Sequence, residues 1–214
     1  YDRYGVQGGD WGSIISREIS RVDPENVAGC HITMLTGGPP GKSDDMEDVT
    51  DIEQKLLDRA AWYQAEDDGY FRIQQTRPQT LGTGLNDSPA GLLAWITEKF
   101  YGWTDNGGDL LNTVDKDKLL ANISLYWFTG TINSSTRIYY EMFKTLEPGF
   151  GSTGDTPVGV SVFPYELMMP RRRWVEDSMN LVLWNEHEKG GHFASLETPE
   201  VFIEDVRECF RGLR

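Results

Sequence analysis

The segment Gly8–Gly12 places an acidic side chain, Asp10, in a glycine-rich turn. A short apolar run ends just before this turn, and a run with helical spacing begins just after it. The pattern small-x-acid-x-small between a strand and a helix is typical of a strained turn that exposes a nucleophile, with Asp10 in the nucleophile's position. The alternative is an ordinary turn in which Asp10 caps the following helix.

One of the three histidines is placed to act as a base. His192 follows Gly190-Gly191 in a loop after the last predicted strand, where the base of a nucleophile–acid–histidine series belongs. A lone histidine in such a loop can also be structural. His31 lies inside an apolar strand and is interpreted as a core residue. His187 is flanked by charged residues and is interpreted as solvated.

The acid of the series is expected after the strand that precedes the histidine loop. Glu166 follows the apolar run 158–163 directly, whereas Asp155 and Glu176 are competing carboxylates that an exposed surface would also explain. Asp10, Glu166 and His192 each follow a predicted strand. The carboxyl ends of parallel strands meet at one edge of a sheet, so the sequence order favours a common site.

The apolar spacing predicts an α/β protein with an inserted helical block. Strands are expected at 4–8, 27–35, 158–163 and 180–184, and helices at 11–22, 170–177 and 199–213. Between them, helical periodicity appears at 49–66, 89–103, 116–128 and 134–146. The order of these elements resembles the second half of an α/β-hydrolase, with the core at 1–36 and 156–214 and a helical cap at 37–155. Because four strands alone leave an exposed edge, we expect a strand-rich first half of the fold to lie outside this sequence.

The composition is that of a soluble globular protein, with 38% hydrophobic and 25% charged residues. The net charge of −14 disfavours binding to nucleic acid or anionic lipid. No apolar run approaches the ~18 residues that a membrane span needs. Cys30 and Cys209 are expected to be free thiols, which suits the cytoplasm. The cluster 171–173 is interpreted as a solvated helix start.

A carboxylate nucleophile restricts the reaction. Attack on an ester would give an anhydride, whereas attack on an sp³ carbon gives an alkyl ester that water can hydrolyse. Epoxides and alkyl halides therefore fit as substrates. Epoxide opening needs an acid at the departing oxygen, which a phenol can supply. The predicted cap carries several tyrosines, most of them expected to be packing residues: Tyr63, Tyr70, Tyr101, Tyr126, Tyr139 and Tyr140.

Several segments share a family pattern. They are GGDWGS at 8–13, GYFRIQQTRPQTLGTGLNDSPAGLLAWITEKF at 69–100, LYWFTGTINSSTRIYYE at 125–141, VFPYEL at 162–167 and GGHFASLETPE at 190–200. In these segments the chain resembles the microsomal-type epoxide hydrolases, which include the juvenile hormone epoxide hydrolases, along nearly its whole length. The stretches LNDSPAGL and YWFTGTINSS are the most specific.

The resemblance implies a role for each core residue of the candidate site. Asp10 would attack an epoxide carbon, and His192 would activate water against the resulting ester. Glu166 would orient His192 and stabilise its charge. The backbone N–H of Trp11 would donate to the oxyanion during ester hydrolysis.

The resemblance also implies two cap tyrosines, Tyr70 and Tyr139, that hydrogen-bond the epoxide oxygen. Tyr140 is adjacent to Tyr139 and stays open as the second acid. No metal and no organic cofactor are implied. The reacting partners would be a small apolar epoxide and water. An aromatic set in the predicted cap suggests a sizeable apolar pocket; its members are Trp62, Phe71, Trp95, Trp103, Trp127 and Phe128.

The sequence departs from the family at two places. The family's first half, with an HGWPG-like loop that completes the oxyanion hole, is absent from these residues, so we expect little turnover from this chain by itself. A preceding segment or a second copy could complete the fold. The stretch 36–60 is also short and acidic for this family. Two alternatives stay open, namely a haloalkane dehalogenase and an inactive fragment or subunit of a split hydrolase.

Overall fold

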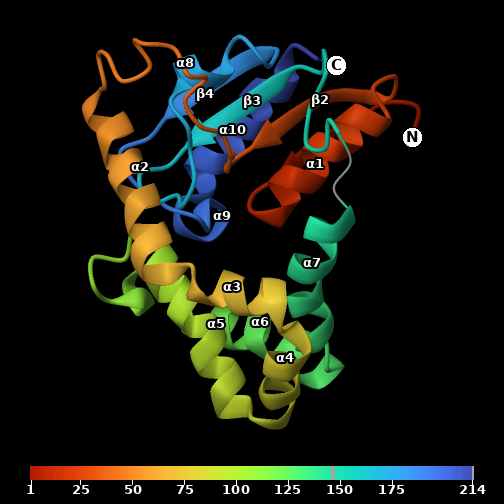
Figure 1. Cartoon of the computed structure of the whole chain (residues 1–214), viewed down its shortest axis with the longest axis vertical. Coiled ribbons are helices and arrows are strands. Elements are labelled where there is room, and N and C mark those ends of the chain that lie inside the picture. Colours follow the sequence, from red (N-terminus) through yellow and green to blue (C-terminus); the bar gives the residue numbers. More distant parts are fainter. Residues whose placement is uncertain (146–147, 214) are drawn as a thin grey trace. The chain divides into compact units, whose positions relative to one another are not determined.

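The computed structural model describes residues 1–145 and 148–213, which form two compact units. The core unit comprises Tyr1–Ala61, Trp103–Asp105 and Gly149–Arg214. The cap unit comprises Trp62–Gly102 and Asn106–Pro148 (Figure 1). None of the helices in the described part of the chain is both long enough and apolar enough to cross a membrane.

The core unit contains a four-stranded parallel sheet in the order β1-β2-β3-β4. Its strands are β1 (Tyr4–Gly8), β2 (Val27–Ile32), β3 (Val158–Val162) and β4 (Leu181–Glu186). The central strand β3 is buried at every position, which explains its apolar sequence VGVSV. Because all strands are parallel, their carboxyl ends meet at one edge of the sheet.

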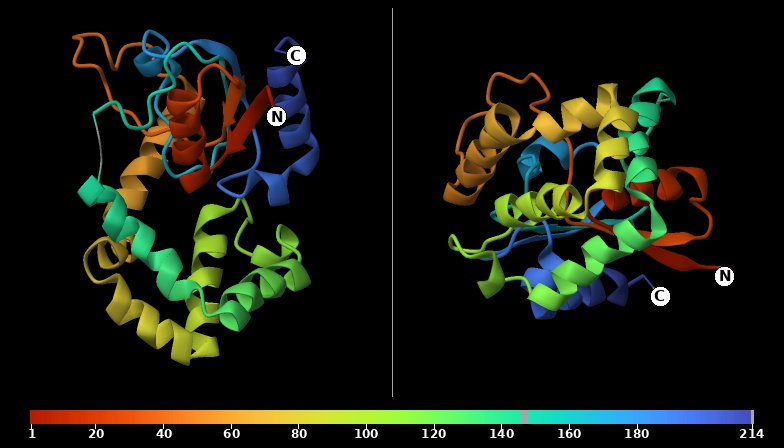
Figure 2. Two further views of the ribbon diagram at one scale, coloured as in Figure 1. Left: turned by 90° about the vertical axis from the view of Figure 1, so that its right-hand side faces the viewer. Right: turned by 90° about the horizontal axis from the view of Figure 1, so that it is seen from below.

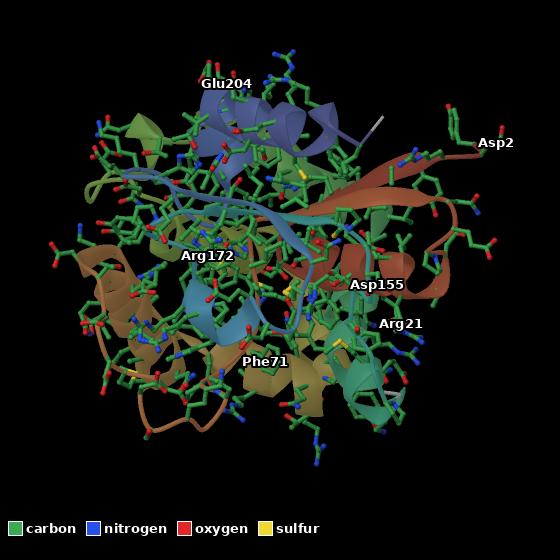
Figure 3. The ribbon with its side chains drawn as sticks, turned by 90° about the horizontal axis from the view of Figure 1, so that it is seen from above. Asp2, Arg21, Phe71, Asp155, Arg172 and Glu204 are labelled. Carbon is green, nitrogen blue, oxygen red and sulfur yellow. The ribbon has the colours of Figure 1, made fainter. Side chains whose placement is uncertain are left out.

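Helices cover both faces of this sheet. The helix α1 (Trp11–Val22) packs on β1 and β2, while α10 (Pro199–Arg211) packs on β2, β3 and β4. Figure 3 shows Glu204 and the rest of α10 on one side of the sheet and α1 on the other. The fully buried positions of α1 are the serines at 13, 16 and 20, whereas Ile19 is partly buried against the core and Ile15 is 48% exposed.

The acidic stretch after β2 belongs to the core unit, although the sequence placed the cap from residue 37 onward. Arg171, only 3% exposed, donates to the carbonyl oxygens of Asp45, Glu47 and Asp48 and pairs with Glu53 at 3.0 Å. The interpretation of this arginine as solvated is therefore wrong. Its hydrogen bonds hold the stretch that leads into α2 (Asp51–Trp62).

The α2 helix adds Leu56 to the apolar core beside Met169 and Val175 of the segment that contains the short helix α8 (Arg172–Val175). Residues 149–155 also group with the core unit. The compact cap unit is thus narrower than the predicted range 37–155, because both ends of that range contact the core unit's own residues.

The cap unit is helical (Figure 2). A π-helical turn at Tyr63–Asp67 leads into α3 (Gly69–Thr76), α4 (Pro78–Asp87) and α5 (Pro89–Trp103). A 3-10 turn at Leu110–Asn112 precedes α6 (Lys116–Thr129) and α7 (Ile132–Thr145). The α7 helix packs on both α3 and α4. The predicted helix 134–146 ends on a residue outside the described part of the chain.

Local signals fix the ends of the cap helices. Pro89 opens α5, and the hydroxyl of Ser88 accepts the N–H of Gly91 at 3.0 Å, as the Ser-Pro pair predicted. Asp115 caps α6 by accepting the Lys118 N–H, and Gly130 ends that helix in the left-handed conformation.

Candidate active site

Asp10 lies in a strained turn between β1 and α1. Its backbone has φ 50° and ψ −128°, a region that non-glycine residues rarely adopt. A side chain at Gly8 would overlap the backbone of Gly12, so only glycine allows the strand to turn into the helix so tightly. The Asp10 carboxylate accepts the Trp11 N–H at 2.5 Å, as a capping residue would, but an ordinary cap has an extended backbone.

A line of hydrogen bonds joins the three predicted site residues of the core unit. His192 Nε2 lies 2.8 Å from Asp10 Oδ2, and His192 Nδ1 lies 2.7 Å from Glu166 Oε1. Glu166 is fully buried and His192 is 8% exposed, whereas the side chain of Asp10 is 37% exposed. The imidazole thus bridges one buried carboxylate and one accessible carboxylate.

Each of these residues follows the carboxyl end of a strand. Asp10 follows β1, Glu166 sits in a turn closed by its N–H to the Phe163 carbonyl after β3, and His192 lies on the loop after β4. The competing carboxylates do not reach the imidazole: Asp155 is exposed, and Glu176 is exposed and pairs with Arg172 on the surface.

The two carboxylates control the charge of the imidazole. Burial alone would lower the pKa of His192, but the charges and hydrogen bonds of Glu166 and Asp10 reverse this and raise the pKa to about 10. Burial would likewise raise the pKa of Asp10, yet His192 and the Trp11 N–H hold it below its usual value. At neutral pH the site therefore contains an imidazolium beside an ionised Asp10.

A pocket in the core unit opens onto the Asp10–His192 pair. It has a volume of about 360 Å³, and Gln7, Thr33 and Phe202 are among its lining residues. Asp10 and His192 both face this space. A small molecule there could reach the carboxylate oxygen and the imidazole nitrogen together.

The other two histidines lie on the α10 face of the sheet. His31 is fully buried with Nε2 2.9 Å from the Ser161 hydroxyl, as expected of a core histidine, and burial lowers its pKa to about 4. His187 was predicted to be solvated, and this prediction is wrong. Its Nε2 lies 2.6 Å from Asp205 Oδ2, and its ring stacks on Phe163.

Asp205 was not singled out from the sequence. It is 4% exposed in α10 and accepts hydrogen bonds from Ser161 and Asn185 as well as contacting His187. The sequence feature that could have identified Asp205 is its place as an acid on the apolar face of an amphipathic helix, between Phe202 and Cys209.

The two predicted cap tyrosines lie side by side in the cap unit. Tyr70 in α3 and Tyr139 in α7 have ring centroids 6.0 Å apart at an angle of 84°. The Tyr63 hydroxyl lies 3.1 Å from that of Tyr70. Tyr140 instead packs its ring against Lys144, with Nζ 3.6 Å from the centroid. The structure thus pairs Tyr139 rather than Tyr140 with Tyr70.

The aromatic residues predicted for the cap lie in different surroundings. Phe71 contacts Tyr139 with ring centroids 5.4 Å apart, so it belongs to the tyrosine cluster. Phe128 is 84% exposed. Trp103 groups with the core unit, where its ring and the His192 ring meet edge to face with their centroids 5.0 Å apart. Within the described residues, no cluster of three or more His, Cys, Asp or Glu could hold a metal ion.

The parallel sheet, the strained aspartate turn and the ordered Asp–Glu–His constellation define an α/β-hydrolase. Known proteins place the chain more narrowly. It is 44% identical over its whole length to a Stigmatella aurantiaca protein with the provisional name epoxide hydrolase, and 34% identical to epoxide hydrolase 1 of Sus scrofa. The juvenile hormone epoxide hydrolase structure of Bombyx mori superposes with a TM-score of 0.88 at 32% identity.

The chain is homologous over its whole length to these epoxide hydrolases and has the α/β-hydrolase fold. It spans about half the length of the curated relatives it matches, covering 48% of the Stigmatella protein and 52% of the pig protein, and 55% of the solved Bombyx chain. No protein-family model matches it.

Proposed function

We propose that the protein hydrolyses epoxides to vicinal diols through an alkyl ester on Asp10. The observation that carries the proposal is the chain of hydrogen bonds from Asp10 through His192 to Glu166 in a turn that exposes the carboxylate. The relatives described above are named epoxide hydrolases, which supports the same reaction.

The first step would be attack of an Asp10 carboxylate oxygen on an epoxide carbon. That forms a carbon–oxygen ester bond and breaks the ring's carbon–oxygen bond. The departing oxygen would take a proton from Tyr70 or Tyr139, the neighbouring phenols of the cap unit. The ionised state of Asp10 at neutral pH supports its role as nucleophile.

The second step would be hydrolysis of the ester. Alkylation neutralises Asp10, which removes its charge and its hydrogen bond from His192, two of the causes that raise the histidine's pKa. His192 would then release its proton and take one from water. Hydroxide would attack the ester carbonyl, with the Trp11 N–H donating to the oxyanion, and collapse would release the diol. Glu166 would hold the imidazole and balance its positive charge.

The substrate class that fits is a sizeable apolar epoxide. Aromatic side chains beside the two tyrosines support this, since Phe71 contacts Tyr139 and Tyr63 contacts Tyr70. Neither a metal nor an organic cofactor is needed for the two steps. The reaction consumes one water for each epoxide.

The test is a single turnover in ¹⁸O-water with styrene oxide, using the full-length protein encoded by the natural gene and an Asp10→Ala control. We expect the first diol to carry unlabelled oxygen from Asp10 and the label to enter the Asp10 carboxylate. Diol that contains only solvent oxygen, or that still forms in Asp10→Ala, contradicts the ester mechanism. Halide release from alkyl halides without epoxide opening would instead indicate a dehalogenase.

A further inference from the structure

The loop that carries His192 is held by a carboxylate outside the three proposed site residues. Glu197, half-buried in the short helix α9 (Ala194–Glu197), accepts the N–H groups of Gly191 and Phe193, the residues on either side of His192. Its second oxygen accepts the Asp105 N–H at 2.8 Å. One carboxylate thus binds both flanks of the proposed base.

The tripeptide Trp103–Asp105 holds the same loop from a distant part of the sequence. The His192 N–H donates to the Trp103 carbonyl at 2.9 Å, and the Gly190 N–H donates to Asp105 Oδ2 at 3.2 Å. The Trp103 ring meets the His192 ring edge-on, with centroids 5.0 Å apart. Consequently every backbone N–H from 190 to 193 has an acceptor on Glu197 or on this tripeptide.

This arrangement has a use in the reaction. Without these acceptors, the backbone of the loop between β4 and α9 would make few hydrogen bonds and would be mobile. A catalytic base displaced by about 1 Å can lower the reaction rate roughly a hundredfold. Hydrogen bonds to an ionised carboxylate are stronger than neutral ones. Burial raises the pKa of Glu197, while the N–H groups that it accepts oppose this rise.

We propose that Glu197 is a positioning residue. Together with the Trp103–Asp105 tripeptide, it fixes His192 for the hydrolysis step. The inference rests on the proposed function. It makes a distinction within that function, because His192 takes a proton from water only after the ester has formed. Loosening its loop should slow ester hydrolysis and leave ester formation unchanged.

The Glu197→Gln substitution tests this with almost no change in volume. A glutamine presents an N–H₂ group either to the Asp105 N–H or to the N–H groups of Gly191 and Phe193, so at least one hydrogen bond is lost. Glu200→Gln is the matched control, since Glu200 is exposed and lies three residues further along the chain. Both variants would be made in the full-length protein encoded by the natural gene.

The ester on Asp10 would be followed by rapid quenching and mass measurement of the intact protein after mixing with styrene oxide. We expect Glu197→Gln to form ester at the wild-type rate and to hydrolyse it roughly 10- to 100-fold more slowly, so that ester accumulates. Glu200→Gln should behave like the wild type. Unchanged ester formation also shows that the variant is folded. Equal loss in both steps, or hydrolysis at the wild-type rate, overturns the inference.

A double-mutant cycle shows whether Glu197 acts through His192. In a His192→Gln background, adding Glu197→Gln should not slow the residual ester decay further. An additional slowing in that background would show that Glu197 acts by another route. If the wild type and His192→Gln both fail to form any ester on Asp10, the proposed function itself fails, and the inference falls with it. Ester formation with unaltered hydrolysis in Glu197→Gln refutes the positioning role alone.

Discussion

The strained backbone of Asp10 gives a prediction about stability that is independent of catalysis. Asp10→Ala and Asp10→Gly both remove the carboxylate, and therefore both lose the contacts with His192 and the Trp11 N–H equally. They differ at φ 50° and ψ −128°, where a Cβ is strained and glycine is not. We expect Asp10→Gly to be the more stable of the two variants.

The size of the difference follows from two opposing contributions. Holding a non-glycine residue in such a region costs roughly 1–3 kcal/mol. Glycine loses more backbone freedom on folding, which costs about 0.5–1 kcal/mol relative to alanine. The free energy of unfolding of Asp10→Gly should therefore exceed that of Asp10→Ala by about 1 kcal/mol.

Urea unfolding of the two variants at pH 7 measures this difference. The same pair of substitutions at Glu204, exposed on α10 and pointing away from the sheet in Figure 3, is the control. There alanine should be the more stable by about 1 kcal/mol, because the backbone is helical. An alanine variant at Asp10 as stable as the glycine variant would refute the argument that this turn is strained.

Two further predictions concern the charged groups of the core unit. Replacing Arg171 by alanine should lower the free energy of unfolding by about 3–5 kcal/mol, because it removes the partner of the largely buried Glu53 charge and a donor to the carbonyl oxygens of Asp45, Glu47 and Asp48. Arg172→Ala, at the exposed next position along the chain, should stay within about 0.5 kcal/mol in the same urea titration. The protonated His192 stabilises the folded state fully below pH 6.5, and this contribution is lost as the pH rises toward the folded pKa of about 10. The difference in unfolding free energy between wild type and His192→Gln should therefore shrink between pH 7 and pH 10, and a difference that stays constant would contradict the raised pKa.

The sequence predicted the sheet and its two covering helices well, because their signals are local. The apolar stretch 158–163 and the terminal amphipathic helix were placed within a few residues of β3 and α10. In the cap unit, α5 was predicted with its observed ends because Ser88 and Pro89 mark its start. Local capping and periodicity carry this information.

The helices α3 and α4 were not predicted as elements, because their stability comes from distant contacts. Glycines at 82 and 84 weaken helix propensity in α4. Gly82, however, lies so close to α7 that a Cβ there would be 2.9 Å from the Asn133 Cα. The glycine that argues against a helix in the sequence thus permits the helix packing that stabilises it.

The same reasoning explains the misjudged charges. Arg171 was expected to be solvated because the arginine cluster between Pro170 and Trp174 indicates a helix start, yet its acceptors lie 118–126 residues earlier at 45–53. His187 was expected to be solvated because charged residues flank it, yet Asp205 meets it from the opposite helix. Burial of a charged group is decided by partners that are distant in sequence and cannot be read from its neighbours.

Within the candidate site, the position of the nucleophile depends on residues next to it in sequence, whereas the position of the base also depends on distant ones. Asp10 is fixed by a turn whose glycines are adjacent to it, so a five-residue pattern was enough to single it out. His192 lies on a loop whose N–H groups are held by Glu197 and by Trp103–Asp105. Only the order of residues along the chain pointed to it. Two of the acceptors that fix its position lie in a tripeptide 85 or more residues earlier, where no local pattern could reveal them.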